Sequence, residues 1–211
     1  MIGLLNKIRK SDKKINIKKE IVISFFILSL GIGLGILSKW LDSRSFNSVI
    51  LNHLDLGNFF SDYTVWLFVA LTISIFSHNP IKAAIDVFLF FVGMVVSYHL
   101  CTVLFVGFNP TNYMKIWYTL TILSPILAYI CWYAKSTHKL SIVLDSIIIF
   151  VMLHSCFSIG LVYFDFKGIL YTLVFVSTVI VLYKDFKNIT ISLLIGLLLS
   201  FIIRNPLNYI Y

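Results

Sequence analysis

Seven stretches of the chain are apolar and almost free of charge, and they constrain the fold more than any other feature. A helix needs about 20 apolar residues to cross the hydrocarbon core of a bilayer. Only 12% of the 211 residues are charged, against about 25% in soluble domains, so too few charges are present to cover a soluble globule. We therefore predict an integral membrane protein of the all-α class, a polytopic transmembrane helical bundle. The predicted spans are residues 21–38, 63–76, 83–106, 115–134, 140–163, 168–183 and 189–203.

The number of spans is the least constrained part of this prediction, and six or eight spans are alternatives. The second, sixth and seventh stretches are short for a bilayer. The last two could also form a tight helical hairpin. Lys184, Asp185 and Lys187 lie between them and favour a loop that reaches the membrane surface.

The cations predict the orientation, because cytoplasmic loops of membrane proteins are enriched in Lys and Arg. With seven spans and the N-terminus inside, 12 of the 17 cations are cytoplasmic and five are external. The C-terminus would then be external. The cytoplasmic set is Lys7, Arg9, Lys10, Lys13, Lys14, Lys18, Lys19, Lys82, Lys135, Lys139, Lys184 and Lys187.

The pattern predicts a basic cytoplasmic arm over residues 1–20 and a single transmembrane domain over residues 21–211. Leu4, Leu5 and Ile8 indicate that the arm lies along the inner leaflet as an amphipathic helix, with affinity for anionic lipid. We expect the lipid bilayer as the main partner and no nucleic acid, because no basic and aromatic surface follows the cluster.

Residues 39–62 form the longest predicted loop, on the outer face. Phe46, Val49, Ile50 and Leu54 have the spacing of one helical face, which predicts a short interfacial helix that ends at residues 56–58. A plain loop is the alternative.

Small residues at helical spacing predict where the spans pack, because they let membrane helices approach closely. Gly31 and Gly35 lie one turn apart in the first span, and Gly93 and Ser97 lie likewise in the third. Gly196 belongs to a similar stripe in the seventh. Pro125 removes a backbone donor in the middle of the fourth span and should kink it.

Ionisable side chains inside apolar spans are costly and are therefore candidates for function. Asp86 and Asp145 lie near the cytoplasmic ends of their spans, and Asp42 continues the small stripe of the first span. All three are candidates for binding a ligand or an ion. The alternative for Asp86 and Asp145 is a carboxylate near a helix N-terminus that pairs with Lys82 or Lys135.

His99 and His154 are predicted at similar depth in spans that run in the same direction. They are candidate ligands, and two imidazoles at one depth could hold a haem or a soft metal. The alternative is that each ring bonds a nearby carbonyl or hydroxyl group. No metal-binding motif is present, and we expect no cofactor.

The signatures of the common catalytic families are missing, including the nucleophile elbow, the zinc-protease helix and the phosphate-binding loop. Three Cys in apolar stretches do not form a disulfide framework. We therefore expect a protein that is not an enzyme.

Three segments carry a resemblance: GILSKWLDS at 35–43, the pair AA at 83–84 with FLFFVGM at 88–94, and SPILAY with WYAK within 124–135. Together they resemble an uncharacterised family of small bacterial multi-pass membrane proteins, a domain-of-unknown-function group. This resemblance implies a location in the bacterial cytoplasmic membrane and no activity. In its glycine-rich first span the chain is also similar to substrate-binding subunits of energy-coupling-factor transporters.

These features lead to one main functional hypothesis and two alternatives. We expect a non-enzymatic membrane subunit that binds a small molecule, associated with transport and with other membrane or ATPase subunits. The first alternative is an intramembrane haem, metal or redox protein that uses His99 and His154. The second is a structural membrane protein.

Overall fold

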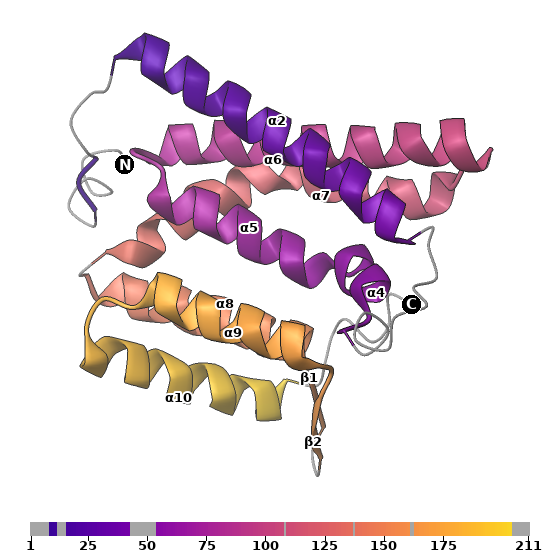
Figure 1. Ribbon diagram of the computed structural model, residues 1–211. Helices are drawn as coiled ribbons and strands as arrows, with labels where there is room; N and C mark the ends of the chain where they lie inside the picture. Colours follow the sequence, from indigo (N-terminus) through magenta and orange to yellow (C-terminus); the bar gives the residue numbers. More distant parts are fainter. Residues whose placement is uncertain are drawn as a thin grey trace. The chain divides into compact units, whose positions relative to one another are not determined.

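A computed structural model describes residues 9–11, 16–42, 54–107, 109–136, 138–160 and 163–203 of the chain. In these residues the chain is helical apart from one short β-hairpin (Figure 1). The helical class is therefore confirmed, and all seven stretches predicted to span the membrane contain a helix. The elements are α2 (Ile17–Asp42), α4 (Leu56–Ser61), α5 (Tyr63–Phe76), α6 (Pro80–Cys101), η1 (Thr102–Val106), α7 (Thr111–Trp132), η2 (Tyr133–Lys135), α8 (Lys139–Cys156), β1 (Phe157–Ile159), β2 (Phe164–Phe166), α9 (Ile169–Leu182) and α10 (Phe186–Ile202).

Four of these helices are long and apolar enough to cross a membrane, as expected of an integral membrane protein. They cover Ile17–Asp42, Pro80–Val106, Thr111–Lys135 and Lys139–Cys156. Helices α5, α9 and α10 are apolar but have only 14, 14 and 17 residues. At 1.5 Å per residue they reach about 21–26 Å, less than the roughly 30 Å of a hydrocarbon core. The count of seven spans stays a prediction.

Helix α8 ends earlier than the predicted span 140–163. After Cys156 the chain forms β1, which pairs antiparallel with β2, and Phe157 lies opposite Phe166. Beyond the paired residues of the hairpin, the Gly160 amide donates to the Tyr163 carbonyl at 2.9 Å. Hydropathy alone does not separate an apolar strand from the end of an apolar helix, so the sequence did not reveal this hairpin.

The predicted outer loop is only partly within the described residues. Phe46, Val49 and Ile50 lie outside them, as do Leu4, Leu5 and Ile8 of the predicted N-terminal helix. Residues 56–58 begin helix α4, whereas the sequence predicted a helix end there. The helical conformation is interrupted one residue earlier, at Asp55, whose φ of 45° is in the left-handed region.

The chain divides into two compact units. The described residues of Ser11–Ser61 and Val69–Trp132 form the α2–α7 unit, and those of Met1–Lys10, Asp62–Phe68 and Tyr133–Tyr211 form the α8–α10 unit. Helix α5 begins in the second unit and ends in the first. The single transmembrane domain over residues 21–211 stays a prediction.

Close contact between α2 and α6 organises the α2–α7 unit (Figure 1). A Cβ atom on Gly31 or Gly35 would overlap backbone oxygens of α6, and one on Gly93 would lie 2.6 Å from the Leu28 carbonyl oxygen. Ser97 adds a bond between the helices, because its hydroxyl donates to the Ile32 carbonyl at 3.1 Å. The small residues predicted for packing thus lie where the two backbones meet.

Helix α7 runs through Pro125 without ending. Proline has no N–H, so the carbonyl of Thr121, one turn earlier, loses its usual helical partner. The hydroxyl of Ser124 donates to that carbonyl at 2.8 Å. The serine before the proline therefore satisfies the backbone group that the proline leaves free, as apolar surroundings require.

In the α8–α10 unit, α8 packs against both α9 and α10, and Figure 1 shows the three helices side by side. A Cβ on Gly196 would lie 2.7 Å from the Ile149 side chain, so this glycine allows α10 to approach α8. The Ser192 hydroxyl donates across the same interface to the Ile142 carbonyl at 3.3 Å.

Candidate functional site

Asp86 belongs to a buried polar cluster between α2 and α6. Lys82, one turn earlier in α6, lies 2.6 Å from its Oδ1 atom, and the Ser24 hydroxyl donates to the same oxygen at 2.7 Å. The Lys82 ammonium also bonds the Ser24 hydroxyl and the Glu20 carbonyl, the latter at 3.0 Å. The side chains of Lys82 and Asp86 are only 7% and 2% exposed.

This cluster holds the two helices together in a defined register. The ammonium of Lys82 has three partners, and Asp86 accepts from both Lys82 and Ser24. The arrangement is the pairing with Lys82 that the sequence offered as the alternative to a ligand site. We therefore treat Asp86 as a residue that positions α6 against α2.

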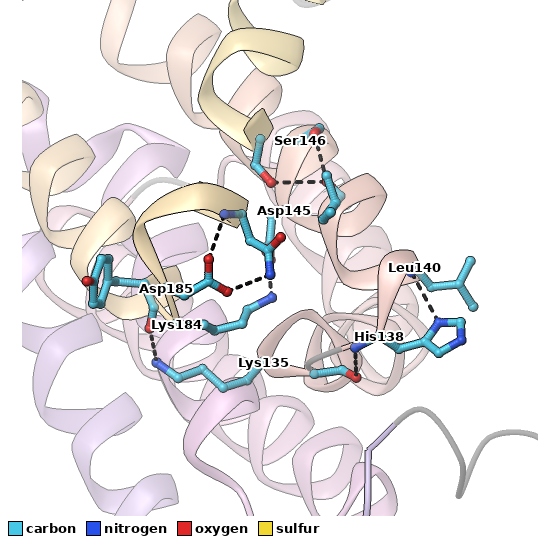
Figure 2. Close-up of polar contacts among 12 residues, drawn as sticks. Lys135, His138, Leu140, Asp145, Ser146, Lys184 and Asp185 are labelled. Atoms are coloured by element: carbon cyan, nitrogen blue, oxygen red, sulfur yellow. Dashed lines mark hydrogen bonds and ion pairs between the residues drawn. The ribbon is translucent and has the colours of Figure 1, made fainter. Parts of the chain in front are cut away.

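Asp145 is paired differently from the sequence prediction. Its Oδ2 atom lies 2.7 Å from the ammonium of Lys184, which precedes α10 (Figure 2). The predicted partner, Lys135, instead donates to the carbonyls of Val181 and Tyr183 at 2.7 and 3.1 Å. Those carbonyls at the end of α9 lack helical partners, and a lysine is a suitable donor to them. The sequence placed both lysines near Asp145 but could not show which one satisfies the α9 carbonyls.

Two buried oxygens beside this ion pair have no partner among the described residues. They are Oδ1 of Asp145 and the hydroxyl of Ser141, one turn earlier on the same face of α8. The Asp145 residue is 1% exposed and Ser141 is 0% exposed. Buried polar groups are nearly always bonded to protein or to an ordered molecule. We refer to these two oxygens as the Asp145–Ser141 pair.

The surroundings of the Asp145–Ser141 pair limit its chemistry. Lys184 already neutralises the carboxylate, and the Lys135 ammonium lies close enough to act on it. A further cation would be repelled by these two ammonium groups, and an anion would be repelled by the free carboxylate oxygen. The pair is therefore suited to a neutral group that donates hydrogen bonds.

His99 has partners on both ring nitrogens. Nδ1 lies 2.7 Å from the Tyr118 hydroxyl and Nε2 lies 2.9 Å from Oδ1 of Asn109. Because the Asn109 oxygen only accepts, Nε2 donates to it, and in the neutral ring Nδ1 then accepts from the tyrosine hydroxyl. This is the environment that the sequence gave as the alternative to a metal ligand.

His154 is 2% exposed, and neither of its ring nitrogens has a hydrogen bond among the described residues. Its ring contacts the edge of Phe150 at 4.8 Å between centroids, and the Ile203 backbone and Lys167 are nearby. His99 and His154 belong to different units. In the described residues, no three His, Cys, Asp or Glu side chains group as metal ligands would.

Asp42 lies at the end of α2, where its Oδ2 pairs with Lys39 at 2.8 Å. The hydroxyl of Tyr98 donates to the same oxygen at 3.3 Å, and that of Ser61 donates to Oδ1 at 3.5 Å. Unlike Asp86 and Asp145, Asp42 is accessible, with 36% of its side chain exposed.

Sequence reasoning selected the three aspartates but missed Ser24, Ser141 and Lys184. The spacing of Ser141 and Asp145, one turn apart, was a usable signal for a shared face. Ser24 and Lys184 are brought in by packing between helices far apart in the sequence, so no local pattern could have identified them.

The chain matches no family model, no curated protein and no solved structure. The two resemblances seen in the sequence therefore stay predictions, and the residues of the site are the basis for a function.

Proposed function

We propose that this protein is a non-enzymatic multi-pass membrane subunit that binds a small polar molecule inside its helices, as part of a transport system. The observation that supports it is the Asp145–Ser141 pair, two enclosed oxygens in an apolar helix that have no hydrogen-bond partner in the described part of the chain. Leaving such groups unbonded costs about 1–3 kcal/mol each, which favours a bound molecule at this position.

The ligand of this proposal is a small, neutral molecule with O–H or N–H groups. One donor would bond Oδ1 of Asp145, and a second group would exchange a hydrogen bond with Ser141. Because both side chains are almost completely enclosed, the ligand of this proposal has few atoms, and it would need a local opening of the α8–α10 unit to enter.

The location and topology belong to the same proposal. We place the protein in the cytoplasmic membrane of a bacterium, with seven spans and a cytoplasmic N-terminus in contact with anionic lipid. The cation distribution supports the orientation, and the resemblance to small bacterial membrane proteins supports the location.

The ligand is tested by extracting small molecules from the purified protein and identifying them by mass spectrometry. Ser141→Ala and Asp145→Asn should lose a molecule that co-purifies with the wild type. Ser146→Ala is the matched control, because Ser146 is equally buried on α8 but donates to the Ile142 carbonyl at 2.7 Å. A wild-type sample that carries only lipid, detergent and water contradicts the proposed ligand.

The transport association is tested separately by chemical crosslinking in membranes before purification. We expect defined companion subunits in the crosslinked sample. An isolated chain without companions would contradict the transport role and leave the ligand test unaffected.

A further inference from the structure

We propose that the end of the α2–α7 unit carries a second binding site, which recognises an alkylammonium group. The site consists of Asp42, Lys39, Tyr98, Tyr113 and Ser61, which come from α2, α4, α6 and α7. We call these five residues the ammonium site. It does not depend on the Asp145–Ser141 pair, which belongs to the other unit.

An alkylammonium group of the protein itself already occupies this position. This group is the end of the Lys39 side chain. The Lys39 Nζ atom lies 2.8 Å from Oδ2 of Asp42 and 5.3 Å from the centre of the Tyr98 ring. A carboxylate together with an aromatic face within about 6 Å is the combination with which proteins bind organic cations. Lys39 therefore marks the chemistry of the site and acts as an internal occupant.

The carboxylate is held by groups other than Lys39. The hydroxyls of Tyr98 and Ser61 donate to its two oxygens at 3.3 and 3.5 Å. The Tyr113 hydroxyl in turn donates to the Ser61 backbone carbonyl at 3.4 Å, and its ring lies 6.4 Å from that of Tyr98. Removal of the lysine side chain should therefore leave Asp42 and the aromatic rings in place.

An external ligand can compete with Lys39 at a small energetic cost. The two charged groups lie three residues apart on one helix, and the side chains of Lys39 and Asp42 are 14% and 36% exposed. Because the carboxylate is open to solvent, we compare the pair with surface ion pairs, which contribute about 0–1 kcal/mol, and with cation–π contacts at exposed sites, which contribute about 0.5–1 kcal/mol. A ligand that combines both contacts without the constraint of a short helical linker can replace the lysine.

The aromatic face selects the class of ligand. An inorganic cation would favour several oxygen ligands, whereas this site offers one carboxylate and the face of the Tyr98 ring. An anionic ligand would be repelled by Asp42. A primary or quaternary alkylammonium group satisfies the carboxylate and the Tyr98 ring together.

Titration calorimetry of the full chain in detergent tests the site, with tetramethylammonium and n-butylammonium as probes. Lys39→Gln removes the internal occupant and should tighten binding of both probes roughly tenfold over the wild type, because the ion pair and the cation–π contact of Lys39 no longer compete with the probe. In the Lys39→Gln background, Asp42→Asn should abolish binding. Asp165→Asn in that background is the control, because it removes an exposed acid of β2 and should leave binding unchanged.

Tyr98 provides a second, independent pair of variants. In the Lys39→Gln background, Tyr98→Phe keeps the aromatic face and should bind tetramethylammonium within about threefold of the parent, whereas Tyr98→Leu should lose it. The proposal is overturned if Lys39→Gln binds the probes no better than the wild type. It is also overturned if Asp42→Asn or Tyr98→Leu leaves binding unchanged.

Discussion

Lys82 and Asp86 are charged residues that lie almost completely out of solvent, and removal of either should be costly. Asp86→Leu leaves the Lys82 ammonium buried with only the Ser24 hydroxyl and the Glu20 carbonyl. Breaking a buried ion pair by losing one partner costs about 3–5 kcal/mol, whereas replacing both partners by apolar residues is often nearly neutral. We therefore expect Lys82→Met and Asp86→Leu each to destabilise strongly, and Lys82→Met/Asp86→Leu to be closer to the wild type.

Denaturant unfolding in detergent measures this difference for the single and double variants. A double variant that is less stable than both single variants would contradict the account of this pair. Lys115→Met, which removes an exposed lysine of α7, serves as the control for loss of a cation.

Ser124 should contribute to the free energy of unfolding only because Pro125 follows it. Ser124→Ala leaves the Thr121 carbonyl without a donor, which should cost about 1 kcal/mol. In the Pro125→Ala background the residue 125 amide can bond that carbonyl, so Ser124→Ala should then be nearly neutral. Unfolding free energies of the four proteins in this double-mutant cycle check the coupling, and equal costs of Ser124→Ala in both backgrounds would refute it.

At the scale of elements, the α2–α6 contact should depend on particular glycines and not on glycine content. Gly31→Ala, Gly35→Ala and Gly93→Ala place a methyl group against backbone atoms of the partner helix. Overpacking of this kind typically costs about 1–3 kcal/mol. Gly33→Ala is the matched control, because a Cβ there meets nothing within 4 Å, and it should be neutral or slightly stabilising.

Thermal unfolding of these four variants measures the effect. Equal stability of Gly33→Ala and Gly31→Ala would show that α2 does not pack on α6 as described.

The helices were predictable from the sequence, because long uncharged stretches have few alternatives in an apolar environment. The start of α6 also has a local signal, since Asn79 accepts from the Lys82 amide and Pro80 follows it. The hairpin after Cys156 was not predictable, because Phe157 and Ile159 are as compatible with a helix end as with a strand. The site was predictable only in part: Asp145 is exceptional within an apolar stretch, but its partner Lys184 is selected by the packing of α10 on α8.

At the scale of the whole molecule, the short helices α5, α9 and α10 decide the topology. If all seven helices cross the membrane with the N-terminus inside, residue 185 faces the cytoplasm and residue 167 faces outward. Single cysteines at these positions, in a chain whose Cys101, Cys131 and Cys156 are replaced by serine or alanine, can be labelled with a membrane-impermeant thiol reagent. We expect labelling of intact cells at residue 167 and not at residue 185. If both positions are equally accessible to the reagent, α9 and α10 form a hairpin that does not cross the membrane.

The Asp145–Ser141 pair is tested most directly by the unfolding temperature of Ser141→Ala beside that of Ser146→Ala, both in detergent. If a bound molecule bonds the Ser141 hydroxyl, its loss removes about 1 kcal/mol, which lowers the unfolding temperature by about 2–4 °C for a chain of this size. The Ser146→Ala variant should unfold close to the wild type. If the hydroxyl is instead buried without any partner, its removal relieves a desolvation cost, and Ser141→Ala will unfold at or above the wild-type temperature, which would contradict an occupied site.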